Sequence, residues 1–162
     1  MSRPGRAPQA VLAVGVQARP RQTVYPEPYA SQMAGREKCA LGDVFNLGSF
    51  GVNLTRLPPW SGSALQHAHS LQDEFVYVLE GTLTLRTEHG RQTMAPGMCA
   101  GFPARTRNAH HLRNVSDLDA VYLVIGDRTA GDSVFYPDDD LHAAATADGW
   151  AFTRKKNGEP YP

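Results

Sequence analysis

The chain from residue 50 to residue 125 is a succession of short segments rich in β-branched, aromatic and other apolar residues. They recur about every ten residues and are separated by turn-forming pairs such as Pro58-Pro59 and Pro96-Gly97, a pattern typical of antiparallel sheets. No part of this region repeats apolar residues at helical spacing. The sequence therefore predicts an all-β sandwich or barrel, with strands at residues 50–57, 65–69, 74–79, 82–87, 98–102, 110–114 and 120–125.

Two segments without a sustained period flank this region. Residues 1–40 contain five prolines and should form an irregular arm that wraps the surface or pairs along a sheet edge. Residues 41–130 are expected to form the barrel, and residues 131–162 a C-terminal extension. Within the extension, three aspartates after Pro137 predict a helix start followed by a short Ala-rich helix. Residues 150–154 lie between two turn signals and predict a final hairpin strand.

Length and charge narrow the classes of partner. The 162 residues suit one domain, and 16 basic residues balance 16 acidic ones, so no positive field would collect nucleic acid or anionic lipid. No apolar run approaches the ~20 residues that span a bilayer, and residues 10–16 behind Arg3 and Arg6 are only weakly similar to a secretory signal. We expect a cytoplasmic protein that binds a small molecule, with Cys39 and Cys99 as buried thiols. The arm and the sheet edges favour a homodimer.

His67-Ala68-His69 is the most informative motif for chemistry. Alternate residues of a strand point to the same face, so the two imidazoles should project together with about 7 Å between their Cα atoms. Glu74 opens the next predicted strand and can reach the same space, and His110 is a fourth candidate far along the chain. A lone histidine facing a core is usually only a hydrogen-bonded polar side chain. The convergence of two paired histidines, a carboxylate and a further histidine instead favours a metal site with open coordination positions.

Segment 62–81 resembles the first motif of the cupin superfamily, which is glycine, HxH, four residues, glutamate, six residues and glycine, here GSALQHAHSLQDEFVYVLEG. Segment 97–114 is similar to the second motif, which is glycine, five residues, proline and then His-x3-Asn. The wider region 45–127 fits that superfamily's jelly-roll barrel, a double-stranded β-helix. More narrowly, the chain resembles small stand-alone bacterial cupins labelled sugar-phosphate isomerase-like. The resemblance implies that one divalent transition-metal ion, Zn, Mn, Fe or Ni, is bound by His67, His69, Glu74 and His110.

The resemblance favours His110 over His111, because only His110 keeps the His-x3-Asn spacing to Asn114 and the parity of Leu112. His111 would then face outward or toward a partner subunit. The chain departs from the motifs in three ways. Gly62 is one residue closer to the HxH than usual, and Met98 replaces a frequent aspartate. The third departure is Arg105, which stands where the motif has a turn glycine. A side chain there argues against a positive φ, or implies strain if the backbone keeps it.

A site of this type permits three kinds of function. The first is a metal-dependent enzyme acting on a small polar metabolite, such as a sugar or sugar phosphate in an isomerase-like reaction. The others are an iron-dependent dioxygenase and a non-catalytic binding or sensing module. The catalytic groups are not identifiable from the sequence. An anionic substrate could be attracted by the loop residues Arg105 and Arg107, although loop arginines are usually solvated. The candidate substrate-binding residues are Arg56, Tyr77, Asn114 and Tyr122.

Overall fold

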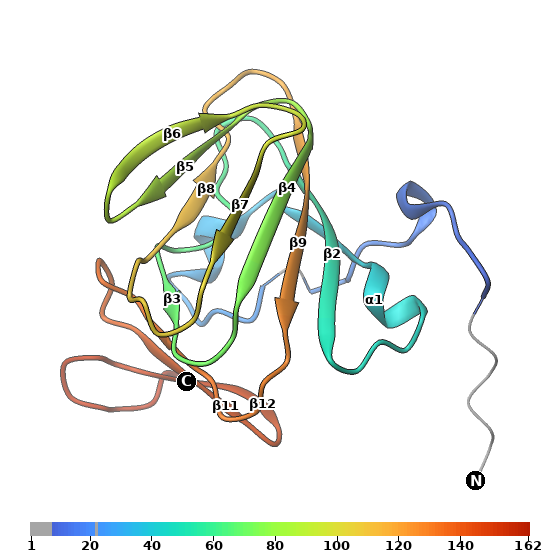
Figure 1. Ribbon diagram of the computed structural model, residues 1–162. Helices are drawn as coiled ribbons and strands as arrows, with labels where there is room; N and C mark the ends of the chain where they lie inside the picture. Colours follow the sequence, from blue (N-terminus) through green and yellow to red (C-terminus); the bar gives the residue numbers. More distant parts are fainter. Residues whose placement is uncertain (1–7, 22) are drawn as a thin grey trace, which may run out of the picture.

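A computed structural model describes residues 8–21 and 23–162, so the first seven residues of the predicted arm, with Arg3 and Arg6, lie outside the described residues (Figure 1). The regular secondary structure of the described chain is almost entirely β. Its short helices are η1 (Ala13–Gly15), η2 (Ala30–Met33) and α1 (Leu41–Val44). Its strands are β1 (Glu37–Ala40), β2 (Phe50–Leu57), β3 (Ala68–His69), β4 (Glu74–Glu80), β5 (Leu83–Thr87), β6 (Gly90–Met94), β7 (Cys99–Phe102), β8 (His111–Arg113), β9 (Ala120–Asp127), β10 (Ser133–Phe135), β11 (His142–Thr146) and β12 (Gly149–Thr153). The all-β prediction is confirmed.

Two antiparallel sheets enclose the main hydrophobic core. One has the strand order β1-β2-β9-β4-β7 and the other β6-β5-β8. The sequence of strand β4 has the two-residue period of a strand with one face on the core. Val76 and Val78 are buried, while Phe75 and Tyr77 between them are each 38% exposed. The core residues come from both sheets: Leu57, Val76, Val78, Leu83, Leu85, Met94, Phe102, Leu112, Ala120 and Tyr122.

A third sheet, in the order β12-β11-β10-β3, joins the C-terminal extension to the barrel. Strand β10 pairs with β3, so His69 lies opposite Val134. A second core lies beneath this sheet and includes Tyr29 and Met33 of the arm, packed with Tyr136 and Leu141 of the extension. The arm and the extension thus share a core of their own, while β1 extends the five-stranded sheet by pairing with β2, as one reading of the arm had predicted.

The prediction of a helix after the three aspartates was wrong. The Ala-rich segment is strand β11, which pairs with both β10 and β12. Pairing on both sides and the burial of Ala143 override the intrinsic helix preference of alanine. The predicted final hairpin is present as β11 and β12, joined by Ala147-Asp148, and Gly149 at the start of β12 has a φ of 118°.

The prediction that both cysteines are buried was also wrong. Cys39 is half-buried, and Cys99 is exposed on β7. Strand β7 is an edge strand of the five-stranded sheet, and the alternation along it turns Phe102 inward and Cys99 to solvent. Within the described ranges, no helix has the length and hydrophobicity needed to cross a membrane.

Candidate metal centre and its cavity

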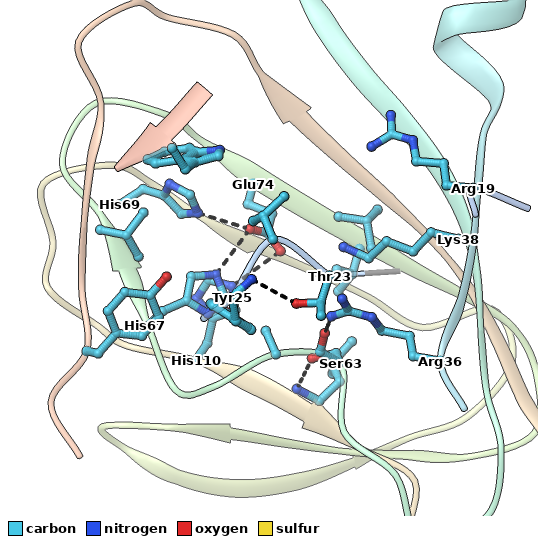
Figure 2. A pocket seen from close by; sticks show the side chains of 18 of the residues that line it. Arg19, Thr23, Tyr25, Arg36, Lys38, Ser63, His67, His69, Glu74 and His110 are labelled. Carbon is cyan, nitrogen blue, oxygen red and sulfur yellow. Dashed lines mark hydrogen bonds and ion pairs between the residues drawn. The ribbon is translucent and has the colours of Figure 1, made fainter. Parts of the chain in front are cut away.

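Glu74 is the centre of the candidate site, and three imidazoles surround its carboxylate (Figure 2). Its Oε2 atom lies 3.6 Å from His67 Nε2 and 3.5 Å from His69 Nε2, and its Oε1 atom lies 3.4 Å from His110 Nε2. The strands explain the convergence. His67 bridges to His110, His69 is on β3, and Glu74 begins β4. The structure therefore brings together all four residues that the cupin resemblance implies.

The hydrogen bonds of two histidines direct their Nε2 atoms toward the carboxylate. His67 Nδ1 lies 2.8 Å from the Leu65 carbonyl oxygen, which can only accept, so Nδ1 must carry the proton. His69 Nδ1 lies 2.6 Å from Asp132 Oδ2. In both rings this leaves an unprotonated Nε2 in the neutral form, which is the state that binds a metal.

Asp132 is a functional residue that the sequence analysis missed. It is fully buried and 63 residues from His69 in sequence, and it also accepts hydrogen bonds from the Leu71 backbone at 2.8 Å and the Ser70 hydroxyl at 3.1 Å. Burial alone would raise the pKa of Asp132, but these donors hold it below its usual value. A carboxylate behind a ligating histidine fixes the ring and its tautomer. Nothing periodic surrounds Asp132 in the sequence, so only the β10–β3 pairing reveals it.

His110 is held by packing instead of hydrogen bonds. Its ring stacks on Phe102 with the centroids 3.5 Å apart, and it is 3% exposed. Among the described residues, neither of its ring nitrogens has a hydrogen-bond partner. Because an unsatisfied buried nitrogen is costly, a ligand for Nε2 is the simplest account of this arrangement. Burial lowers the pKa of His110, which keeps the ring neutral and able to bind a metal.

The four residues fit a divalent transition metal. Donor atoms about 2.1 Å from an ion in tetrahedral geometry lie roughly 3.4 Å apart, close to the spacing of the Nε2 atoms from the Glu74 oxygens. His67, His69 and Glu74 form a group of mutually close donor atoms; His110 lies outside that group, although its Nε2 is 3.4 Å from Glu74 Oε1 and its ring centroid is 4.6 Å from that of His67. Burial alone would raise the pKa of Glu74, yet in the metal-free site protonated imidazoles around it hold that pKa well below its usual value, so the carboxylate is charged.

Replacing the turn glycine of the cupin motif by Arg105 leaves the backbone conformation of the turn unchanged. Arg105 keeps a positive φ of 68°, so a residue with a side chain does adopt the left-handed conformation. Two hydrogen bonds hold the turn: Arg105 N–H donates to the His69 carbonyl at 3.1 Å, and Ala104 N–H donates to Asp73 Oδ1 at 2.7 Å. The turn therefore still anchors the backbone of a candidate ligand, at the cost of local strain.

The ligands lie in a cavity of ≈ 390 Å³. Of the four predicted substrate-binding residues, only Tyr122 lines it. Arg56 is bound on the outer surface by Glu37 and Asp119, each at 2.7 Å. Tyr77 alternates with buried Val76 and so faces outward.

Asn114 is fully buried and donates to the carbonyls of Leu57 and Leu118, which is a structural role in a turn. Neither Arg105 nor Arg107 lines the cavity. Arg107 instead lies over the ring of Phe135. His111 is half-buried on β8 and lines a different depression.

Comparison with known proteins identifies the architecture. Residues 53–126 match the family model of the cupin domain. A crystal structure of a sugar phosphate isomerase from a cupin superfamily of Silicibacter pomeroyi is 41% identical, with a TM-score of 0.88, over 93% of this chain and 95% of that one. The chain is a member of the cupin superfamily. The jelly-roll prediction is thereby confirmed.

Two further solved structures extend this comparison. A candidate sugar phosphate isomerase of Acidithiobacillus ferrooxidans is 33% identical, with a TM-score of 0.70, over 75% of this cupin and 78% of that chain. A polyketide cyclase of Streptomyces resistomycificus shares the fold at 18% identity, with a TM-score of 0.60, over 74% of this chain and 78% of that one. Comparison with functionally curated sequences finds no match.

Proposed function

We propose that this cupin is a metal-dependent enzyme that acts on a small polar metabolite, a sugar or sugar phosphate, by an isomerase-like proton transfer. The observation that carries the proposal is the convergence of three histidine Nε2 atoms on the Glu74 carboxylate inside a cavity of small-molecule size. A divalent ion bound there supplies a Lewis acid that polarises a carbonyl or hydroxyl oxygen. The description of the Silicibacter relative as a sugar phosphate isomerase supports the same reaction class.

The residues of the cavity suit an oxygen-rich ligand. Tyr122 is fully buried and lines the cavity, and burial raises its pKa, so its hydroxyl stays neutral and able to donate a hydrogen bond to a substrate oxygen. Tyr136 also lines the cavity; burial and its hydrogen bond with Tyr25 raise its pKa, so its hydroxyl stays neutral too. The apolar lining, which includes Val76, Leu112 and Val124, excludes water from the region around the ligands.

The test begins with elemental analysis of protein purified without a metal-binding tag, alongside the His69→Ala variant and an exposed-histidine control, His89→Ala. The metal-loaded protein is then incubated with sugars and sugar phosphates in D2O. We expect about one metal per chain, retained by His89→Ala and lost by His69→Ala, and deuterium incorporation that requires the metal. Oxygen consumption by an iron-loaded form would favour a dioxygenase. Saturable binding without exchange would favour a binding module, and either result would refute the isomerase proposal.

A further inference from the structure

The charges that line the cavity are strongly unbalanced. Among the described residues, four cationic side chains line it, and Glu74 is the sole acidic one. The four cations, which we call the basic wall, are Arg19, Arg21, Arg36 and Lys38. A divalent ion at the ligands would offset Glu74 and add further positive charge, so the cavity as a whole favours an anionic occupant.

The basic wall comes from the arm and from β1, not from the barrel strands that carry the metal ligands. Arg19 is tied to β1 by a backbone hydrogen bond, in which its N–H donates to the Lys38 carbonyl at 2.9 Å. Farther along the arm, the ring of Tyr25 contacts Tyr136 and Phe152 edge-to-face, with centroids 6.0 and 5.9 Å apart. Residues 19, 21 and 23–25, at and between these two anchors, all line the cavity.

The members of the basic wall differ in depth. Arg36 is 4% exposed and donates to the Ser63 carbonyl, and Lys38 is half-buried. Arg19 and Arg21 are exposed, and Arg19 also pairs with Asp43 at 3.1 Å. Burial and the neighbouring Arg36 lower the pKa of Lys38 to about 8. The protonated Lys38 is therefore destabilised in the ligand-free cavity, and a bound anion would reduce that penalty.

The two kinds of group occupy opposite sides of the cavity. In Figure 2 the three histidines surround Glu74 on one side, and Arg19, Lys38 and Arg36 lie on the other. A ligand that spans both sides needs neutral oxygen donors at one end and negative charge at the other. Several cations on one side of a cavity suit a tetrahedral dianion with three acceptor oxygens better than a carboxylate, which has two oxygens and a single charge.

We propose that the basic wall is an anion subsite that binds the phosphate group of a small phosphate monoester, whose oxygen-bearing carbons then face the metal ligands. Only the part of the inference that concerns the metal end of the ligand rests on the proposed function; the anion subsite does not depend on it. It selects the phosphorylated class over the neutral sugars that the metal site would equally accept, and it makes the arm part of the substrate-binding site.

Isothermal titration with glycerol phosphate, inorganic phosphate, acetate and glycerol tests the subsite. Metal-free protein is the decisive form, because phosphate can also coordinate a metal ion directly. The variants are Arg21→Ala, at an exposed position that should not affect folding, and Lys38→Met. The matched control is Arg91→Ala, because Arg91 is an exposed arginine in a second basic depression, which is lined by Arg86, Arg91, His111 and Arg113.

We expect metal-free protein to bind glycerol phosphate, with glycerol and acetate at least about tenfold weaker, as the loss of a charge-assisted hydrogen bond implies. Arg21→Ala and Lys38→Met should each weaken glycerol phosphate binding about tenfold or more, and Arg91→Ala should not. Unchanged affinity in both wall variants, loss of binding in Arg91→Ala, or acetate binding equal to that of phosphate would each overturn the subsite. If the protein binds glycerol phosphate but cannot be loaded with a divalent metal, the proposed function is refuted and the anion subsite is not.

Discussion

Lys38 offers a direct test of the electrostatics of the cavity, because its charge should destabilise the ligand-free fold. Burial lowers its pKa from 10.5 to about 8, with further repulsion from Arg36 and Arg19 and partial relief from Glu74. A depression of this size corresponds to about 3 kcal/mol of unfolding free energy. Lys38→Met keeps most of the side-chain volume and removes the charge, so the variant should be more stable than wild type by up to about 3 kcal/mol at neutral pH.

The stability difference between Lys38→Met and wild type should depend on pH in a way that identifies its cause. Below pH 8 both the folded and the unfolded state carry the protonated lysine, so the folded state bears the full penalty. Between pH 8 and pH 10.5 the unfolded state binds more protons than the folded state, so wild-type stability rises with pH relative to the variant. The advantage of Lys38→Met should therefore be constant below pH 8 and shrink across this window.

Urea denaturation of metal-free wild type and Lys38→Met, at pH 7, 8, 9 and 10, measures the effect. The control is Lys156→Met, at an exposed position, which should differ from wild type by no more than about 0.5 kcal/mol at every pH. A stability difference for Lys38→Met that is independent of pH, or that favours wild type at pH 7, would show that Lys38 is not charged and desolvated in the cavity. Phosphate should reduce the difference at pH 7, because wild type binds the anion more tightly than the variant does.

Four other expectations concern the site and the assembly. Asp132→Asn should lower metal affinity by about 10- to 100-fold without unfolding the protein, since the amide no longer fixes His69; metal competition titration measures this. His69→Ala should lose more metal than Glu74→Gln, whose amide oxygen can still coordinate weakly, and equal metal content in both and in wild type would show that His69 is not a ligand. Arg105→Val should lower stability by about 1–2 kcal/mol, because a β-branched residue tolerates a positive φ poorly, whereas Arg105→Gly should not; thermal unfolding compares them. We still expect a homodimer, and the exposed Phe75, Tyr77 and Leu79 on β4 provide an apolar row for a second copy. Tyr77→Lys should therefore reduce the mass measured by light scattering, and an unchanged dimer mass would show that this row is not the contact.

The candidate ligands could be predicted because their signal is local. Two histidines at alternate positions of a strand must share a face, and Glu74 follows within a short connector. His110 lies far along the chain and was favoured by the cupin resemblance, through its spacing to Asn114 and its parity with Leu112; the structure buries all three residues. Along β4 the strand period turns Val76 and Val78 inward and Tyr77 outward, so the proposal of Tyr77 as a substrate-binding residue was wrong.

Contacts between distant segments could not be predicted in this way. Asp132 reaches His69 through the pairing of β10 with β3, and nothing in its own neighbourhood indicates a buried carboxylate. The wrong helix at residues 142–146 has the same cause, because its alanines adopt a strand only when β10 and β12 lie on either side. Arg56 was a candidate for substrate binding, but Glu37 and Asp119 bind it on the outer face. The basic wall went unnoticed because the proline-rich arm has no period from which side-chain direction could be inferred.

The division between barrel and arm follows from the cost of buried charge. Glu74, Val76 and Val78 share the inner face of β4, and only Glu74, at the strand's end, is polar. A charged residue at Val76 or Val78 would enter the main core without a partner and cost several kcal/mol. The barrel can therefore hold the metal ligands but has no room for the charges that recognise an anion. Those charges must come from a segment outside the main core, and the arm supplies them. Because Arg21 is exposed, its replacement should change stability by less than about 0.5 kcal/mol while changing affinity about tenfold, so the arm can alter substrate charge preference without disturbing the barrel.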